Sequence, residues 1–281
     1  MDKANKVILV PWDFTSGSEI ALKHALQLAK AAGNEIMLFH IIPKVWWRFF
    51  SEKPRFSQEE IDTLKRRIES DADEVSQANN IQIISMVLEG HPVKLFKELV
   101  VTANVNLIVA HKYYQYEKKK FESSSFLRRL TLKNLSIPFI IADAPPIHSH
   151  YIEIVVPLDY DKKYKETLHW IIYLSKYYKC NINLIKPYTS DEGKKKNMAN
   201  NIYFTKKMLD GNKIVYGIKT AKRKKPFREE VFKFANNIEA DLILIMADKY
   251  NNYIEEKKDK NPSKIPIMCI TPRTRKYQSF Y

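Results

Sequence analysis

The chain has 281 residues, of which 45% are hydrophobic and 28% charged, as is typical of soluble globular proteins. No apolar run approaches the roughly 18 residues that a membrane helix needs, and the apolar run near the N-terminus is too short for a secretory signal. We therefore expect a cytoplasmic protein without a membrane partner. The two cysteines, Cys180 and Cys269, have no partner at a metal-ligand spacing and are expected to be buried thiols, so no metal site is expected.

The net charge of +15 is unevenly placed. Residues 1–148 carry 20 Lys and Arg against 17 Asp and Glu, whereas residues 149–281 carry 27 against 15, which gives +3 and +12. A basic second half could attract nucleic acid or another polyanion, or it could be a solvated surface. No nucleic-acid-binding motif accompanies the lysines, so the solvated surface is favoured and polyanion binding stays an alternative.

The first half alternates strands and helices. A β-branched run at 7–10 predicts a strand buried on both faces, and Ser57 with Glu60 forms a capping-box pattern at the start of a charged helix. We expect strands at 7–10, 36–42, 81–88, 107–110 and 138–142, and helices from Ser16 or Ser18 to 32, from 57 to about 78, and at 92–102 and 126–133. The alternation favours an open parallel sheet with helices on both faces.

The second half repeats the first. The run VILVPWDF at Val7–Phe14 recurs 146 residues later as EIVVPLDY at Glu153–Tyr160, so the chain contains two copies of one domain. We expect strands at 154–157, 182–185, 213–218, 242–245 and 265–270, and helices at 164–177, 196–209 and 227–237. The predicted domains are 1–143 and 151–281, joined by a stiff linker at 144–150 that contains two prolines, and they should pair about a pseudo-twofold axis.

In such a sheet the ligand crevice lies at the carboxyl ends of the strands. Asp13 follows the first strand there and has two open interpretations. Its carboxylate could accept hydrogen bonds from a ribose hydroxyl or a base amine, or it could cap the next helix. Asp159 repeats the position in the second copy, which is compatible with both interpretations.

The stretch from Val7 to Ile42, with NLIVAHKYY at Asn106–Tyr114 and LSIPFII at Leu135–Ile141, resembles the universal stress protein family. The resemblance covers essentially the whole chain, which is similar to a tandem member of that family. It implies two five-stranded, doubly wound domains of the adenine nucleotide alpha hydrolase-like type. It also implies association through the last strands, Phe139–Ala142 and Ile267–Thr271, and a homodimer as a further assembly.

The family's nucleotide-binding members carry Gly-x2-Gly-x9-Gly-Ser/Thr after the fourth strand, where glycines let the backbone approach phosphates. In this chain those four positions fall on His111, Tyr114, Ser124 and Ser125, so only the last hydroxyl remains. In the second copy, Met246 and Lys249 stand at the first two glycines, and Leu242 to Pro266 spans 24 positions against 31 from Leu107 to Pro138. The resemblance therefore implies that the ATP cradle is lost in both copies and that the last helix of the second copy is shortened.

Residues that could still hold ATP or AMP lie in both copies. In the first they are Pro11, Asp13, Ile41, Ala110, His111, Ser124 and Ser125, and in the second Pro157, Asp159 and Met246. Lys112 and Lys118–Lys120 could add positive charge, and the hydroxyls of 123–125 could bind an anion at a helix N-terminus or simply cap that helix.

The loop after the second strand contains VWWRFF at 45–50. Trp46, Trp47, Phe49 and Phe50 could form a flap over the sheet or a self-association surface, which we favour, or a protein-partner hot spot or apolar ligand pocket. No catalytic constellation or nucleophile elbow stands out. The expected function is a non-enzymatic, stress-response binding or regulatory protein. The alternatives are an ATP- or AMP-binding member with slow or no hydrolysis, and polyanion binding by the second half.

Overall fold

The computed structural model describes residues 6–43, 56–116, 119–133, 137–223, 225–253 and 264–271. Contacts within the chain divide it into two units, Met1–Phe126 and Leu127–Tyr281. The second unit begins earlier than the domain predicted at 151 because strand 139–142 pairs with strand 267–270 and is grouped with it. No helix among the described residues is long and apolar enough to cross a membrane.

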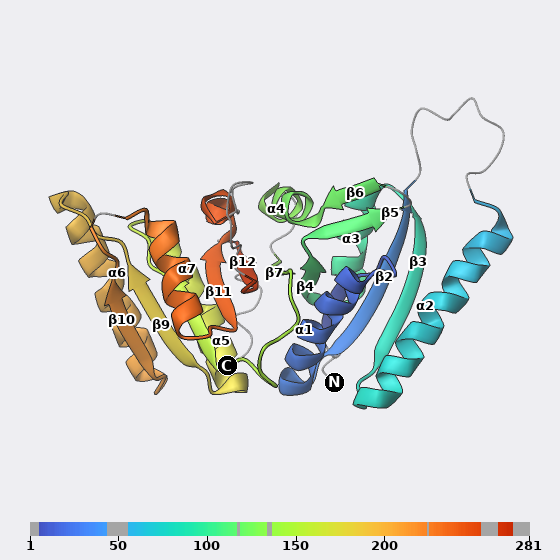
Figure 1. Cartoon of the computed structure of the whole chain (residues 1–281), viewed down its shortest axis with the longest axis horizontal. Helices are drawn as coiled ribbons and strands as arrows, with labels where there is room; N and C mark the ends of the chain where they lie inside the picture. The colour runs from blue at the N-terminus through green and yellow to red at the C-terminus, as the bar shows by residue number, and fades with distance from the viewer. Residues whose placement is uncertain are drawn as a thin grey trace, which may run out of the picture. The chain divides into compact units, whose positions relative to one another are not determined.

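The first unit is a parallel sheet with a helix between successive strands (Figure 1). Its strands lie in the order β4-β1-β2-β3, and each neighbouring pair is parallel. The elements are β1 (Val7–Pro11), α1 (Ser16–Ala32), β2 (Glu35–Pro43), α2 (Gln58–Asn79), β3 (Ile83–Gly90), α3 (Pro92–Thr102), β4 (Val105–His111), β5 (Tyr113–Tyr116) and β6 (Lys119–Glu122). The helix α4 (Ser123–Lys133) follows and crosses the boundary between the units.

Local sequence explains how these elements begin and end. The run at 7–10 is fully buried, as expected for a strand that is covered on both faces. Gly33 ends α1 in the left-handed conformation, with φ of 67°, which a residue without Cβ adopts at little cost. The predicted capping box is present, because the Ser57 side chain accepts from the Glu60 N–H and the Glu60 side chain accepts from the Ser57 N–H.

A two-stranded hairpin between β4 and α4 was not predicted from the sequence. Its strands β5 and β6 are antiparallel, with Tyr114 opposite Phe121. The helix α4 then starts at Ser123, three residues before the predicted Phe126. The hairpin occupies the part of the chain in which the resemblance implies a glycine-rich loop.

The second unit is a six-stranded sheet in the order β10-β9-β8-β11-β12-β7. All neighbouring pairs are parallel except β12 and β7, which are antiparallel and pair Met268 with Ile140, as the resemblance implied. The elements are β7 (Phe139–Ala142), β8 (Glu153–Pro157), the 3₁₀-helix η2 (Lys162–Glu166), α5 (Thr167–Tyr178), β9 (Asn181–Lys186), α6 (Glu192–Gly211), β10 (Tyr216–Thr220), α7 (Phe227–Asn237), β11 (Leu242–Met246), the 3₁₀-helix η3 (Ala247–Asn252) and β12 (Ile267–Ile270).

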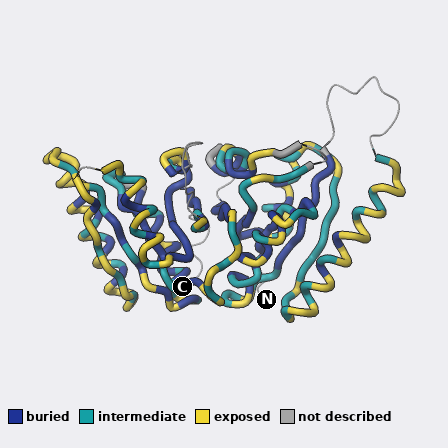
Figure 2. The backbone as a smooth tube through the Cα atoms, viewed as in Figure 1, coloured by how far each residue is buried: buried dark blue, intermediate teal, exposed yellow. Residues whose placement is uncertain are grey.

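The second unit differs from the prediction at the start of α6. The helix α6 begins at Glu192 rather than 196, because the Asp191 side chain accepts from the Lys194 N–H at 2.8 Å and caps it. The inner strands β8 and β11 are mostly buried, and the edge strand β10 is mostly exposed. The helix α6 is exposed over residues 192–197 and buries Met198, Asn201, Thr205 and Leu209 farther along (Figure 2). Cys180 and Cys269 are buried, unpaired thiols, and burial raises the pKa of Cys180 to about 11.

Candidate functional site

In each unit the strand order reverses beside the first strand of that copy. In the first unit β2 lies on one side of β1 and β4 on the other, and in the second β9 and β11 flank β8 in the same way. Ligands of open α/β sheets bind in the crevice outside the carboxyl ends of the strands at such a switch point. We therefore expect the site residues of each copy to lie at its switch point.

At the switch point of the first unit, the Asp13 carboxylate is fully engaged with its own chain. One oxygen accepts from the Thr15 N–H at 3.1 Å and from the Thr15 hydroxyl at 2.6 Å. The other accepts from the Gln115 N–H of the hairpin at 2.6 Å. Asp13 thus fixes the turn before α1 and holds β5, while Thr15, not Asp13, is the N-cap residue of α1.

Tyr114 lies at the second glycine position, and its hydroxyl reaches the ends of β1 and β2. It donates to the Trp12 carbonyl at 3.2 Å, lies 3.1 Å from His40 Nδ1 and accepts from the Ile41 N–H at 3.4 Å. His40 Nδ1 also contacts the Trp12 carbonyl, at 2.8 Å. Burial lowers the pKa of His40, and Arg67 adds to this, while the Trp12 carbonyl and Asp13 oppose it.

Ser124 and Ser125, two of the three serines that could bind an anion or cap the helix, are engaged by a carboxylate of the same chain. Ser124 donates to one oxygen of Glu122 at 3.0 Å, and Ser125 donates to the other at 2.7 Å. Both serines lie in the first turn of α4, where a helix N-terminus favours an anion. Glu122 supplies that negative charge, a role that the sequence alone did not indicate.

His111 ends β4 at the first glycine position and packs against the start of α1. A Cβ atom added to Gly17 would lie 2.5 Å from His111 Nδ1, so the imidazole fits only because residue 17 has no side chain. Pro11 ends β1, and Ala110 is buried in β4. The structure thus gathers these predicted residues at one edge of the sheet, together with the hairpin.

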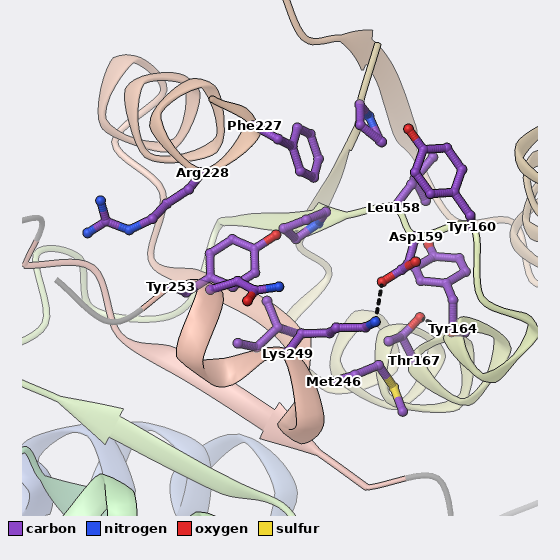
Figure 3. A pocket seen from close by; sticks show the side chains of 14 residues that line it. Leu158, Asp159, Tyr160, Tyr164, Thr167, Phe227, Arg228, Met246, Lys249 and Tyr253 are labelled. Carbon is purple, nitrogen blue, oxygen red and sulfur yellow. Dashed lines mark hydrogen bonds and ion pairs between the residues drawn. The ribbon is translucent and has the colours of Figure 1, made fainter. Parts of the chain in front are cut away.

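The second unit has a cavity of about 270 Å³ at its own switch point (Figure 3). Pro157 at the end of β8 and Met246 at the end of β11 line it, as does Asp159. One oxygen of Asp159 accepts from the Asp161 N–H at 3.0 Å, and the other lies 3.4 Å from Lys249 Nζ. Asn201 donates to the carbonyls of Asp159 and Asp161 and so holds the turn.

Several lining residues of this cavity were not predicted from the sequence. Phe227 enters from the start of α7 and Tyr253 from the residue after η3, and Tyr164 comes from η2. They are far apart along the chain, so only the fold brings them together. The sequence assigned Lys249 to the second glycine position, but its pairing with Asp159 had no signal in the sequence.

The charge on Lys249 is stabilised by its acidic neighbours. Burial lowers its pKa, but the charges of Asp159, Asp248 and Asp161 and the hydrogen bond to Asp159 outweigh burial and raise the pKa overall. Within the described ranges no group of three His, Cys, Asp or Glu side chains could hold a metal ion. The aromatic residues Trp46, Trp47, Phe49 and Phe50, and also Lys118, lie outside the described residues.

The strand order and the connecting helices define a doubly wound α/β fold in each unit. Residues 4–112 match the model of the universal stress protein family. No curated protein matches the sequence.

The fold of both halves together occurs in solved structures. A universal stress protein from Archaeoglobus fulgidus DSM 4304 is 15% identical, with a TM-score of 0.66, over 96% of this chain and 99% of that chain. A functionally unknown protein from Pseudomonas aeruginosa PAO1 is 13% identical, with a TM-score of 0.60, over 96% and 93%. A putative universal stress protein from Pseudomonas aeruginosa UCBPP-PA14 is 12% identical, with a TM-score of 0.60, over 95% and 94%. The tandem α/β fold predicted from the sequence is thereby confirmed.

Proposed function

We propose that this chain is a non-enzymatic, cytoplasmic stress-response protein with a binding or regulatory role, made of domains 1–143 and 151–281. In this proposal the nucleotide crevice of the first domain is closed by the hairpin β5–β6. The observation that carries the proposal is the position of Tyr114, whose hydroxyl contacts the Trp12 carbonyl and the Ile41 N–H at the ends of two neighbouring strands. A ligand that used these backbone groups would have to displace the Tyr114 hydroxyl.

The acceptor and donor groups around the crevice are used internally. Asp13 accepts three hydrogen bonds from Thr15 and Gln115, so a ribose or base would have to replace the one from Gln115. Each such replacement exchanges one hydrogen bond for another and gains little, because a net hydrogen bond contributes only about 0.5–1.5 kcal/mol.

The phosphate end of the crevice is closed by charge. Glu122 receives the hydroxyls of Ser124 and Ser125, and its carboxylate stands where the helix N-terminus favours an anion. A phosphate at the same place would meet a negative charge at short distance, which opposes binding by about 4 kcal/mol per unit charge at 4 Å and an effective dielectric constant of 20.

Calorimetric titration with Mg-ATP, ADP and AMP tests the proposal. The wild-type chain, verified to be folded and free of nucleotide, should give no binding heat with any of the three. The double substitution Tyr114→Ala and Glu122→Gln removes the hydroxyl and the competing charge and should increase nucleotide affinity. Micromolar binding by the wild type that is lost in Asp13→Ala, but kept in the second-domain counterpart Asp159→Ala, would contradict the proposal.

A second candidate function is adenine-nucleotide binding with slow or no hydrolysis in the first domain, through Asp13, Ile41, Ala110 and Ser125. The gathering of these residues at one switch point supports it. It requires that the hairpin leave the crevice when ATP or AMP binds. Nucleotide-dependent exposure of the Gln115 amide to hydrogen exchange would distinguish this candidate from a closed site.

The remaining alternative is polyanion binding by the basic second half, supported by the exposed lysines 194–196 at the start of α6. Affinity for a model polyanion such as heparin that falls steeply with salt would favour it, and an absence of binding at low salt would exclude it.

A further inference from the structure

We propose that the cavity of the second unit binds a small zwitterion that carries an ammonium group, a carboxylate and an apolar body, of the size of an aromatic amino acid. The inference concerns a different crevice from the one closed by the hairpin and does not depend on the function proposed above. It rests on the position, the walls, the ion pair and the charge balance of the cavity.

The cavity lies where this fold presents ligands. Pro157 and Met246 end the neighbouring parallel strands β8 and β11, and both line it. Its volume of about 270 Å³ is near the lower end of the roughly 300–1,000 Å³ that small-molecule sites occupy. The volume thus fits a compact molecule better than a nucleoside triphosphate.

The walls are mainly apolar and aromatic. Phe227, Tyr253, Leu158 and Met246 surround the space, and Tyr164 lies below Asp159 in the view of Figure 3. Tyr164 and Leu158 are almost fully buried, and their side chains are therefore held in place by packing. An aromatic or branched aliphatic body would be removed from water against these rings.

The polar lining of the cavity includes one ion pair, between Lys249 and Asp159. Lys249 extends across the space toward Asp159, and its Nζ lies 3.4 Å from one carboxylate oxygen (Figure 3). About a third of each side chain is exposed to solvent, 35% for Lys249 and 29% for Asp159. A single, partly solvated contact of this kind contributes about 0–1 kcal/mol, so opening it costs little.

An amino acid head group matches the two charges that would be separated. Its ammonium group can pair with Asp159, whose other oxygen is already oriented by the Asp161 N–H, and its carboxylate can pair with Lys249. One internal pair is then replaced by two pairs with the ligand, and no charge is left without a partner. A ligand with only one of the two groups would leave either Asp159 or Lys249 uncompensated.

The charges around the cavity disfavour a polyphosphate. Asp159, Asp161 and Asp248 all act on Lys249, so carboxylates outnumber this lysine at its position. Arg228 also lines the cavity, but its guanidinium points away from Lys249 and packs 5.1 Å from the Phe232 ring centroid. A neutral zwitterion meets these charges without the repulsion that several phosphates would add.

A ligand panel on the wild-type chain is the first test, with binding measured by calorimetry or by ligand-observed NMR. The probes are L-phenylalanine, phenethylamine, 3-phenylpropionate and AMP. L-phenylalanine should bind saturably, and the amine and the acid should each bind at least about tenfold more weakly, because each loses one charge-assisted hydrogen bond. Absence of saturable L-phenylalanine binding, equal binding of phenethylamine, or tighter binding of AMP would overturn the proposal.

Two substitutions locate the site. Asp159→Asn and Lys249→Met should each weaken L-phenylalanine binding by about tenfold or more, since each removes one charged partner. Lys65→Met is the matched control, because it breaks another partly exposed lysine–aspartate pair, with Asp62 on α2, and should leave affinity unchanged. Unchanged affinity in both site variants, with their circular dichroism spectra intact, would place the ligand elsewhere and refute the inference.

Discussion

The Tyr114 hydroxyl offers a direct test of whether the hairpin is held in the first crevice. The substitution Tyr114→Phe keeps the ring and removes only the oxygen that contacts Trp12, His40 and Ile41. The Trp12 carbonyl keeps its contact with His40 Nδ1 at 2.8 Å, so it does not lose every partner. The Ile41 N–H, on a residue that is only 6% exposed, loses this acceptor.

The magnitude follows from these contacts. A lost net hydrogen bond costs about 0.5–1.5 kcal/mol, and a buried donor left unsatisfied costs about 1–3 kcal/mol. Because the contact of Ile41 is long, at 3.4 Å, we place the total near the lower end, at about 1–2 kcal/mol. For a unit of this size the melting temperature should fall by about 3–8 °C.

The assay combines thermal unfolding with hydrogen exchange of peptides that contain Gln115 and Ile41, so that a local opening of the hairpin is seen even if global unfolding is not two-state. Tyr113→Phe is the control, because Tyr113 is the neighbouring tyrosine of the same strand and is 43% exposed. Equal melting temperatures and equal exchange in the two variants would show that the hydroxyl does not hold the hairpin.

Three further predictions concern residues on which each unit depends. Gly17→Ala should destabilise the first unit by about 1–3 kcal/mol through overlap with His111, and in a His111→Ala background the cost should disappear in denaturant unfolding. Asp241→Ala should destabilise the second unit by roughly 2–4 kcal/mol and speed proteolysis at 144–150, because the buried carboxylate accepts from two backbone N–H groups and contacts His148 at 2.8 Å. Burial lowers the pKa of His40 below 6.5 in the folded chain. As the pH falls, the imidazole therefore takes up a proton in the unfolded chain before it does so in the folded chain. Stability should therefore be full above pH 6.5 and fall on acidification toward the folded-state pKa, and urea titrations from pH 8 to 5.5 should show less of this loss in His40→Asn.

The sequence predicted the architecture because the signals that define it are local and repeated. Buried apolar runs such as 7–10 and 242–245 are fixed by hydrophobic burial, and the capping box at Ser57 is complete within four residues. The parallel α/β class of the fold then follows from the alternation of strands and helices.

The hairpin and its contacts could not be predicted in the same way. Residues 113–122 have no hairpin turn dipeptide, and four charged residues follow each other at 117–120. The contacts that hold β5 are tertiary. The Gln115 N–H donates to Asp13 and the Tyr114 hydroxyl donates to the Trp12 carbonyl, each across 102 positions of sequence. The sequence identified the residues at the family's glycine positions, His111, Tyr114 and Ser124, but not the contacts that these side chains make.

The two copies have different residues and contacts at the same switch point. In the first copy Tyr114, which belongs to the hairpin, lies against the strand ends. Moving it away breaks the three contacts of its hydroxyl and the hydrogen bond from Gln115 to Asp13. In the second copy the span from the fourth to the last strand is 24 positions instead of 31, and Lys249 stands where the first copy has Tyr114.

A lysine at this position closes a crevice less firmly than a tyrosine in a hairpin. The flexible side chain of Lys249 is held by its contact with Asp159, at 3.4 Å. It can therefore move aside without any backbone change. Movement of Tyr114 would disturb the pairing of β5 with β6 and the contact of Gln115 with Asp13. Opening should therefore be fast in the second unit and limited by the hairpin in the first, and relaxation-dispersion NMR on the Gln115 and Lys249 amides would measure the two opening rates separately.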